Sequence, residues 1–269
     1  MKSGEPPAGV AVDKVPGHWL LASLGKRVLR PGGLELTRQM LTRLRPSAAD
    51  DVVEFAPGMG VTARLTLAQR PRSYCGVERE ETVAQHLEAR LGGGHVRGVH
   101  FIRASAEATT LASGSATLIY GEAMLSMQTP EQKARILAEA FRVLQPGGRY
   151  GIHELALLPD AIGAAERKAI EREMSMNIHV GVRPATVAEW RRLLQSAGFK
   201  LEWETTAPMH LLEPRRLLSD EGWRGALRIA CNMLRRPGAR GRVLAMRRVF
   251  RRYAPHLSAV AMVCVKPAA

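Results

Sequence analysis

The sequence is poor in cysteine and has no long apolar runs. Its three cysteines, Cys75, Cys231 and Cys264, lie far apart among 269 residues and form no C-x-x-C pair. This argues against a disulfide framework and against a zinc site. No apolar run reaches the roughly 18 to 20 residues that a membrane-spanning helix needs. The first residues, MKSGEPPAGVAVDKVPG, lack the apolar core of a signal peptide, so we expect a cytoplasmic protein.

Acidic residues are scarce relative to basic ones. The chain has 39 Lys and Arg against 25 Asp and Glu, which gives a net charge of +14. Twelve arginines and two acids fall between residues 214 and 253, so the excess is concentrated near the end of the sequence. A field of this sign attracts anions such as nucleic acid, a membrane surface or acidic metabolites. Hydrophobic residues make up 46%, which is enough for a sizeable core.

Strand and helix patterns alternate through the middle of the sequence. Short apolar runs predict strands over 51–56, 73–78, 99–104, 116–120 and 149–155, and apolar residues at three-to-four spacing predict helices over 60–69, 80–91 and 130–144. Further helices are predicted over 18–30, 34–44, 161–176, 186–197 and 214–253, the last broken at RPGARG, with strands over 199–205 and 257–266. This order predicts an α/β fold with a mostly parallel sheet covered by helices on both faces.

A glycine-rich turn follows the first predicted strand, in the stretch VVEFAPGMGV. Gly58 and Gly60 allow a tight turn in which a ligand lies against the backbone, and Glu78 ends the next strand, where a carboxylate can bind ribose hydroxyls. A nicotinamide fingerprint would tolerate Ala63 at its third position, but Glu54 would then repel the pyrophosphate. A cofactor without phosphate and with a cationic amino-acid tail, such as S-adenosylmethionine, suits Glu54 better. The glycines can also serve only a tight turn, and Glu78 only a helix N-terminus.

These stretches together resemble the class I S-adenosylmethionine-dependent methyltransferases. The motifs EFAPGMG, YCGVERE, RASAEATTL, SATLIYGEAMLSM and RVLQPGGRYGIHELAL are similar to the family's motifs in the same order, and the resemblance spans about residues 34 to 206. RPGGLELT and VRPATVAEWRRLLQSAGF are similar to small-molecule methyltransferases of the ubiquinone/menaquinone-biosynthesis type. The resemblance implies a Rossmann-like sheet of seven strands, S-adenosylmethionine as cofactor, S-adenosylhomocysteine as product and no metal.

The resemblance also implies a division of the chain and a set of cofactor contacts. We expect a flexible N-terminus over 1–16, a helical lid over 17–48 and a methyltransferase domain over 49–269 with helical cap elements at about 159–198 and 214–253. The glycine turn would hold the methionine part of S-adenosylmethionine. The end of the second strand would bind the ribose, and the end of the third strand would bind the adenine. The implied cofactor-binding residues are Glu54, Ala56, Gly58, Met59, Gly60, Glu78, Arg79, Ser105, Ala106, Glu107, Tyr120 and Gly121. Family members usually have Asp where this chain has Ser105.

The methyl acceptor should lie over the ends of the first, fourth and fifth strands. His153 is the candidate for base or acceptor hydrogen bond, with a structural histidine as the equal alternative, and Glu122 is a candidate for orienting the cofactor or a loop. The expected substrate pocket comprises His18, Trp19, Met124, His153, Glu154 and His179. His179 can instead be a plain loop residue, and Trp19 can belong to the core.

We therefore expect methyl transfer to a small, apolar or aromatic acceptor. The alternatives are an RNA methyltransferase and a cofactor-binding but catalytically silent regulatory protein. The stretch RGRVLAMRRVFRRYAP predicts an amphipathic helix whose arginines form a solvated face or contact a membrane surface or another anionic partner. No RNA-binding module is recognisable, and YGEAML stands where amino methyltransferases that modify bases have an Asn-Pro-Pro-Tyr-type motif, so nucleic acid is the less favoured partner.

Overall fold

The computed structural model describes residues 15–93 and 98–268. In chain order its main elements are α1 (Gly17–Ser23), α2 (Gly33–Leu44), β1 (Asp51–Phe55), α3 (Val61–Leu67), β2 (Ser73–Glu78), α4 (Glu81–Leu87), β3 (Val99–Arg103), β4 (Ala116–Glu122), α5 (Pro130–Val143), β5 (Leu144–Leu157), α6 (Ala164–Ile178), β6 (Ala185–Thr186), α7 (Val187–Ser196), β7 (Lys200–Pro208), α8 (Pro214–Arg235), α9 (Pro237–Arg252) and β8 (Leu257–Val265). The flexible N-terminus expected over 1–16 lies outside the described residues, apart from 15 and 16.

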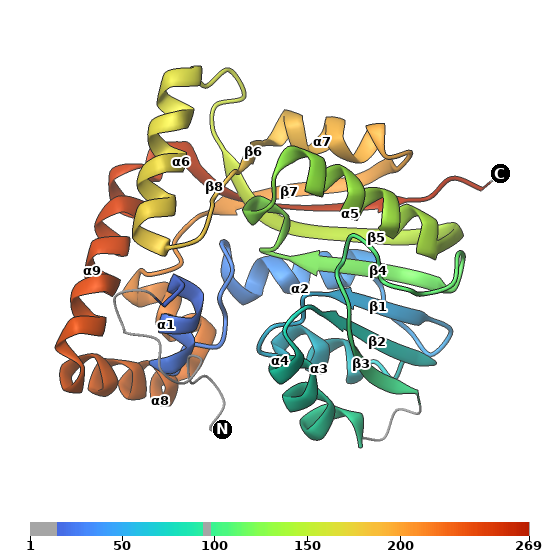
Figure 1. Cartoon of the computed structure of the whole chain (residues 1–269), viewed down its shortest axis with the longest axis horizontal. Helices are drawn as coiled ribbons and strands as arrows, with labels where there is room; N and C mark the ends of the chain where they lie inside the picture. Colours follow the sequence, from blue (N-terminus) through green and yellow to red (C-terminus); the bar gives the residue numbers. More distant parts are fainter. Residues whose placement is uncertain (1–14, 94–97, 269) are drawn as a thin grey trace.

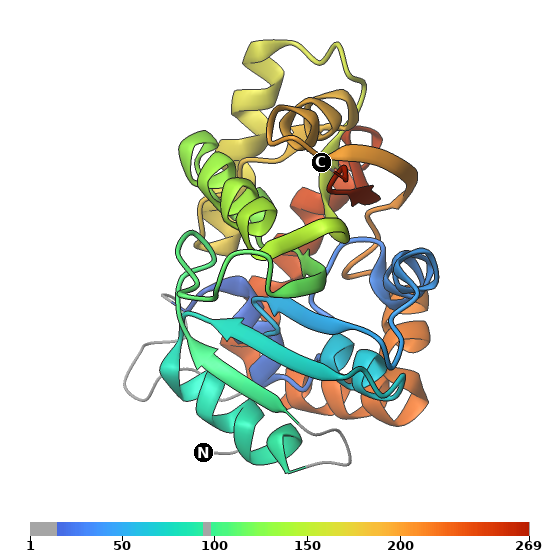
Figure 2. The ribbon, with the colours of Figure 1, turned by 90° about the vertical axis from the view of Figure 1, so that its right-hand side faces the viewer.

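The strands form one sheet in the order β3-β2-β1-β4-β5-β8-β7, and the short β6 pairs with β5 (Figure 1). The β1, β2, β3, β4 and β5 pairings are parallel, whereas β8 runs antiparallel between β5 and β7. Figure 2, turned by a quarter, shows the twist that parallel strands accumulate across a sheet. The mostly parallel, Rossmann-like sheet expected from the sequence is confirmed.

Alternate side chains along each strand belong to two separate cores, one on each face of the sheet. On β1, Val53 and Phe55 join the core beneath α5 and α7, whereas Val52 joins the core beneath α2, α3 and α4. Neighbouring positions of β4 divide in the same way, with Ile119 on the first face and Leu118 on the second. This doubly covered arrangement explains why the strands read as continuous apolar runs in the sequence.

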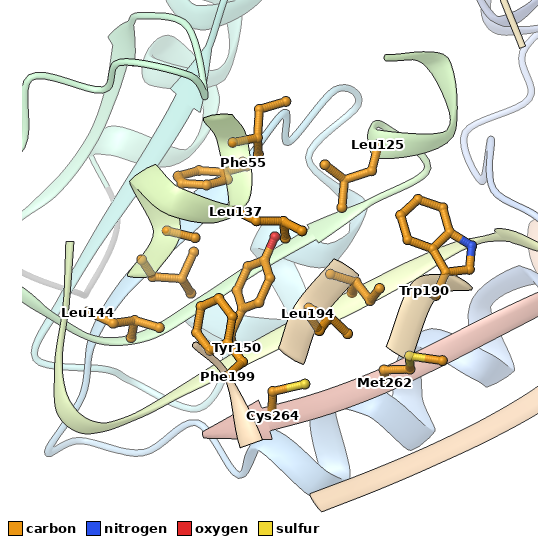
Figure 3. Packing of buried hydrophobic residues seen from close by; sticks show 14 of the residues in the cluster. Phe55, Leu125, Leu137, Leu144, Tyr150, Trp190, Leu194, Phe199, Met262 and Cys264 are labelled. Carbon is orange, nitrogen blue, oxygen red and sulfur yellow. The ribbon is translucent and has the colours of Figure 1, made fainter. Parts of the chain in front are cut away.

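The first core attaches α7 firmly to the sheet (Figure 3). Trp190 of α7 is fully buried, and its indole nitrogen donates to the carbonyl oxygen of Leu155 on β5 at 3.0 Å. Tyr150 of β5 stacks on Phe199 with ring centroids 4.9 Å apart. The second half of the expected cap element over 159–198 therefore packs on the sheet, because the apolar stripe of α7 faces the strands rather than the cap.

A helical cap, formed by α1, α6, α8 and α9, gathers on one side of the sheet (Figure 1). Leu20 and Leu21 of α1 share a core with Ile229 of α8 and Met246 of α9. The expected lid over 17–48 divides, because Leu36, Met40 and Leu44 place α2 against the sheet and leave only α1 in the cap. The helix predicted over 18–30 ends at Ser23, because Gly25 has a φ of 101° that a helix does not accommodate.

A break inside α8 joins the cap to the N-terminal segment. Gly222 has φ 70° and ψ 171°, in addition to the expected break near RPGARG, where α8 ends at Arg235 and α9 begins at Pro237. The buried Glu221 carboxylate accepts from the backbone nitrogens of Arg27 and Val28 at 2.7 and 2.8 Å. Asp220 accepts from the backbone nitrogen of Leu34 at 2.9 Å. Residues 24–34 are thereby held beside the end of the central strand β4, where Arg27, Leu29 and Arg30 line the same cavity as the glycine turn. Among the described residues, no helix has the length and apolarity to cross a bilayer.

Candidate active site

A cavity of about 600 Å³ lies between the cap and the ends of β1, β2, β3 and β4. Most of the residues expected at the site line it. These are Glu54, Ala56, Gly58 and Met59, then Glu78 and Arg79, then Ser105, Ala106 and Glu107, then Glu122 and Met124, and finally His18 and Trp19 from α1. Gly60, Tyr120, Gly121, His153, Glu154 and His179 are absent from the lining and have other positions, described below.

The glycine turn, residues 56–60, has left-handed backbone at three positions. Ala56, Gly58 and Gly60 have φ values of 54°, 53° and 67°. A Cβ at Gly58 would meet only the carbonyl oxygen of Ala56, at 3.8 Å, so this backbone is open to a ligand. A Cβ at Gly60 would lie 2.7 Å from Leu87 of α4. Gly58 therefore leaves room in the cavity, whereas Gly60 allows close packing between the turn and α4.

Glu54 is a buried carboxyl beneath this turn. The Tyr74 hydroxyl donates to it, and the Tyr120 hydroxyl donates at 2.8 Å. Burial raises the pKa of Glu54 to about 7, while the two tyrosine hydroxyls oppose the rise. Tyr120 thus supports Glu54 from below and does not line the cavity, which corrects its expected place. Gly121 is the next residue of β4, paired with Phe55, and it also lies behind the lining.

Glu78 ends β2, next to the turn. The register pairs Phe55 with Val77, which places the residues that follow both strands side by side. The Glu78 carboxylate accepts from the backbone nitrogen of Glu80 at 3.1 Å. Burial raises its pKa, and backbone hydrogen bonds from residues 80, 79 and 58 act in the opposite direction. In nucleotide-binding α/β folds, a carboxylate at this strand end is the group that binds ribose hydroxyls.

The turn after β3 forms the far wall of the cavity. The backbone nitrogen of Glu107 donates to the Ser105 hydroxyl at 3.2 Å, which stabilises a tight turn. The Glu107 carboxylate is held by Arg135 at 2.5 Å and by Gln132 at 3.3 Å. The Glu107 carboxylate is therefore engaged by α5, while Ser105, Ala106 and Glu107 all line the cavity.

Glu122 ends β4 and is the centre of a buried polar cluster. Its carboxylate accepts from Arg30, from the hydroxyl of Thr37 at 2.5 Å and from that of Thr62, and it lies 2.8 Å from Nδ1 of His153. Burial raises the pKa of Glu122, but Arg30 and the hydrogen bonds outweigh it and lower the pKa to about 2. Glu122 is thus a fixed negative charge at the cavity floor, neutralised by the fixed positive charge of Arg30.

His153 does not line the cavity, which corrects its expected role as a base. Its ring is fully buried, Nδ1 faces Glu122 and Thr37, and Nε2 donates to the carbonyl oxygen of Pro31. Both nitrogens are occupied within the protein, so neither is free to take a proton from an acceptor. His153 instead links the segment before α2 to β5 and to the end of β4.

Glu154 and His179 also differ from their expected places in the pocket. The buried Glu154 carboxylate accepts from the backbone nitrogens of Met124, Leu125 and Ser126 at 2.8 to 3.0 Å. It therefore shapes the turn that carries Met124 into the cavity. His179 is exposed at the end of α6, with a φ of 58°, and its neighbour Val180 lines the cavity instead.

His18 occupies the place that was expected of His153. It lines the cavity from α1, and its Nδ1 is buried without a hydrogen-bond partner. Burial lowers its pKa, so the imidazole is neutral near pH 7 and Nδ1 can accept a proton or a hydrogen bond. The Trp19 ring lies beside it, with centroids 5.3 Å apart.

Sequence reasoning missed part of the lining. The missed residues include Arg27, Leu29, Arg30, Thr62 and Gln128. Arg27, Leu29 and Arg30 belong to the segment that Asp220 and Glu221 hold in place, and this tertiary contact leaves no periodic signal in the sequence. Among the described residues, no group of three or more His, Cys, Asp or Glu side chains is arranged to hold a metal ion.

Comparison with known proteins relates this geometry to one family. A family model described as a methyltransferase domain matches residues 52–148, which contain the glycine turn, Glu78 and Glu122. An uncharacterised protein of Haemophilus influenzae is 33% identical over 227 residues, which are 84% of this chain and 88% of that protein. The chain belongs to the class I S-adenosylmethionine-dependent methyltransferases. The cofactor of this methyltransferase is S-adenosylmethionine, and the open backbone at Gly58 with the carboxyls of Glu54 and Glu78 fits it.

Solved structures share the fold of this methyltransferase at low sequence identity. The phosphoethanolamine N-methyltransferase 2 of Haemonchus contortus, in complex with S-adenosyl-L-methionine, has a TM-score of 0.65 at 13% identity, over 93% of this chain and 56% of its own. The [4+2]-cyclase SpnF has a TM-score of 0.66 at 16% identity, over 98% and 99%. A cyclase and a methyltransferase with one fold show that the acceptor chemistry has to be argued from side chains.

Proposed function

We propose that this methyltransferase acts on a small, apolar or aromatic acceptor that binds between the glycine turn and the cap. The observation that carries the proposal is the apolar part of the cavity lining. Trp19 of α1, Leu29, Met124 and Met127 after β4, and Val180 after α6 supply apolar surface in addition to the polar residues that suit the cofactor. The cavity volume lies in the range of sites for small ligands.

The polar wall has groups that match the cofactor part by part. Glu54 is poised to become an anion next to the cationic methionine part of S-adenosylmethionine, because a nearby positive charge lowers the pKa of a buried carboxyl. Glu78 accepts hydrogen bonds from the ribose, and Gly58 lets the cofactor lie against the backbone. When bound, the cofactor supplies an electrophilic methyl group. The protein's own contribution is to align the acceptor and exclude water.

His18 gives the acceptor a chemical preference. Its neutral, unpartnered Nδ1 is buried in the cavity wall beside the Trp19 ring, and a buried polar atom without a partner is costly. An acceptor that carries a hydroxyl or an amine would satisfy this nitrogen and could transfer its proton to it as the new bond forms. An acceptor with a protic group on an apolar body therefore fits the site best.

Transfer of a labelled methyl group tests this proposal. The purified protein is incubated with methyl-labelled S-adenosylmethionine and, in parallel, with an organic extract of cellular small molecules, an aqueous extract and total RNA. We expect label in the organic extract. We expect Glu78→Ala to abolish this labelling, because the variant binds the cofactor more weakly. Label confined to RNA would contradict the proposal in favour of a nucleic-acid methyltransferase. Cofactor binding without transfer to any pool would favour a silent binding protein.

A pair of histidine variants tests the acceptor contact. His18→Gln should lower the turnover rate at least tenfold, as expected for loss of acid–base assistance, and leave the dissociation constant of S-adenosylmethionine unchanged. His100→Gln is the matched control, since His100 is exposed on β3 outside the cavity. Equal turnover in the two variants would contradict a role for His18.

A further inference from the structure

The second half of α8 exposes an apolar stripe on the side opposite its core contacts. After Gly222, the side chains of Trp223, Leu227 and Leu234 are 64%, 57% and 70% exposed, and Ala230 is exposed between them. Their spacing of four, three and four residues places all of them on one face of a helix. Gly225 and Ile229 on the other face are buried, and Ile229 packs against Leu20 and Leu24. We call the four exposed residues the α8 stripe.

An apolar stripe of this kind is unusual on a soluble surface. Single exposed leucines are common, but a tryptophan and two leucines aligned along one helix form a contiguous patch, which marks an interaction site. Figure 1 shows α8 at the outer margin of the cap, beneath α1. The stripe therefore lies on the outside of the element whose inner neighbour, α1, lines the cavity.

Arginines flank the α8 stripe along one side. Arg224, Arg228 and Arg235 directly follow Trp223, Leu227 and Leu234 in the sequence. They therefore form a row parallel to the stripe, about a quarter turn around the helix. The guanidinium of Arg224 lies 5.1 Å from the centre of the Trp223 ring. From residue 223 to residue 252 the sequence contains ten arginines and no acid. Arg247 and Arg251 of α9 pair with Glu213, and Arg252 pairs with Glu173. The α8 stripe therefore combines exposed apolar side chains with a flanking row of arginines, and residues 223–252 themselves contribute no carboxylate.

We propose that the α8 stripe docks on an anionic lipid surface. Tryptophan and leucine side chains enter the interfacial region of a bilayer, while arginines on the adjacent row contact anionic headgroups. A second copy of this chain is a poorer occupant, because a symmetric interface would bring the same arginine rows together. Nucleic acid is poorer too, because a phosphate backbone would leave the apolar stripe in water. The inference does not depend on which acceptor the cavity takes.

Vesicle flotation tests this inference, with the full-length protein and vesicles of either phosphatidylcholine alone or equal parts of phosphatidylcholine and phosphatidylglycerol. We expect wild-type protein to float with the anionic vesicles and at least tenfold less with the neutral ones. The triple variant Trp223→Ser, Leu227→Ser, Leu234→Ser should lose binding at least tenfold through the lost apolar contacts. The double variant Arg224→Gln, Arg235→Gln should bind the anionic vesicles about tenfold less, because it has lost two positive charges next to the stripe.

Two controls keep these effects specific. Met176→Ser removes another exposed apolar side chain, from α6, and Arg72→Gln with Arg103→Gln removes two exposed arginines elsewhere, so both variants should float like wild type. Unchanged cofactor binding in every variant shows that each one folds. Equal flotation of wild type with neutral and anionic vesicles would overturn the inference. A dimer in solution that the triple serine variant dissociates, without vesicle binding by wild type, would overturn it in favour of a second copy.

Discussion

The surroundings of Glu54 and Glu122 differ, although both carboxyls are buried at the ends of adjacent strands. Around Glu54 the partners are neutral hydroxyls, and burial raises its pKa to about 7. Around Glu122 the partners include the guanidinium of Arg30, and its pKa falls to about 2. The difference shows that the N-terminal segment, rather than the sheet, decides which acid is permanently charged. One carboxyl is left responsive to a ligand, and the other is fixed.

Removing Arg30 should give the largest effect, because it makes the surroundings of Glu122 resemble those of Glu54. Arg30→Met leaves Glu122 buried without its cation, and the free energy of unfolding at pH 7 should fall by about 3–5 kcal/mol. Denaturant titration measures this. The matched control Arg103→Met breaks an exposed pair with Glu81, whose side chains are 67% and 52% exposed, and should cost less than about 1 kcal/mol. Similar losses in both variants would contradict the comparison.

The second effect is the pH dependence of stability in the ligand-free protein. The folded-state pKa of Glu54 is raised from 4.5 to about 7, so its stabilising contribution is complete below pH 4.5 and is lost as pH rises through 7. A rise of that size corresponds to about 3 kcal/mol. Relative to wild type, Glu54→Gln should therefore gain about 2–3 kcal/mol in unfolding free energy between pH 5 and pH 8. A difference that stays constant with pH would show that Glu54 titrates normally.

Glu122 contributes with the opposite sign. Its folded-state pKa is depressed to about 2, so its contribution is present above pH 4.5 and is lost as pH falls toward 2. The wild-type protein should accordingly lose stability on acidification below pH 4.5, and Glu122→Gln should lose less over that window. Thermal unfolding of both proteins at pH 3 and pH 5 gives the two slopes.

The third effect concerns cofactor affinity. Binding of a cationic ligand should lower the pKa of Glu54 and release a proton, so S-adenosylmethionine should bind about tenfold more tightly at pH 8 than at pH 6. Glu54→Gln should remove most of this dependence and weaken binding at pH 8 by about tenfold or more. Calorimetric titration in buffers of different ionisation enthalpy measures the released proton. A pH dependence unchanged in Glu54→Gln would assign it to another group.

The smallest expected effect comes from two glycine variants, which distinguish the cost of left-handed backbone from the loss of room for the cofactor. Gly58→Ala and Gly147→Ala both place a Cβ on left-handed backbone, at φ 53° and 76°, and each should cost about 1–2 kcal/mol of stability. Only Gly58 lies in the cavity, so only Gly58→Ala should also weaken cofactor binding. Equal cofactor affinities in the two variants would mean that the space above Gly58 is not used.

The sequence predicted what depends on neighbouring residues and missed what depends on distant ones. The strands, the turn at Gly58 and the position of Glu78 follow from local patterns, and the structure brings Glu54, Gly58 and Glu78 to one cavity as expected. Their contact with the cofactor stays a prediction. For His153 the sequence left a catalytic and a structural role equally open, and the structure favours the structural one. The sequence could not decide because two of its partners, Pro31 and Thr37, lie more than a hundred residues earlier in the chain.

The helical regions show the same limit. An amphipathic pattern in α2 or α7 says that one face is buried but not whether the sheet or the cap buries it. The break at Gly222 was missed because its cause is the hydrogen bonding of Asp220 and Glu221 to residues near the N-terminus. Arg30 carries no local sign of burial, since an arginine before a proline and two glycines reads as an exposed loop.

The place of β8 has a consequence for synthesis on the ribosome. This strand comes from the end of the chain, Leu257–Val265, yet it lies inside the sheet between β5 and β7. Until β8 has been synthesised, the edge of β5 that will pair with it stays unpaired. Unpaired strand edges of this kind promote aggregation. A protein truncated just before residue 257 would keep every residue that lines the cavity. It would lack β8, so the facing edges of β5 and β7 would have no strand between them.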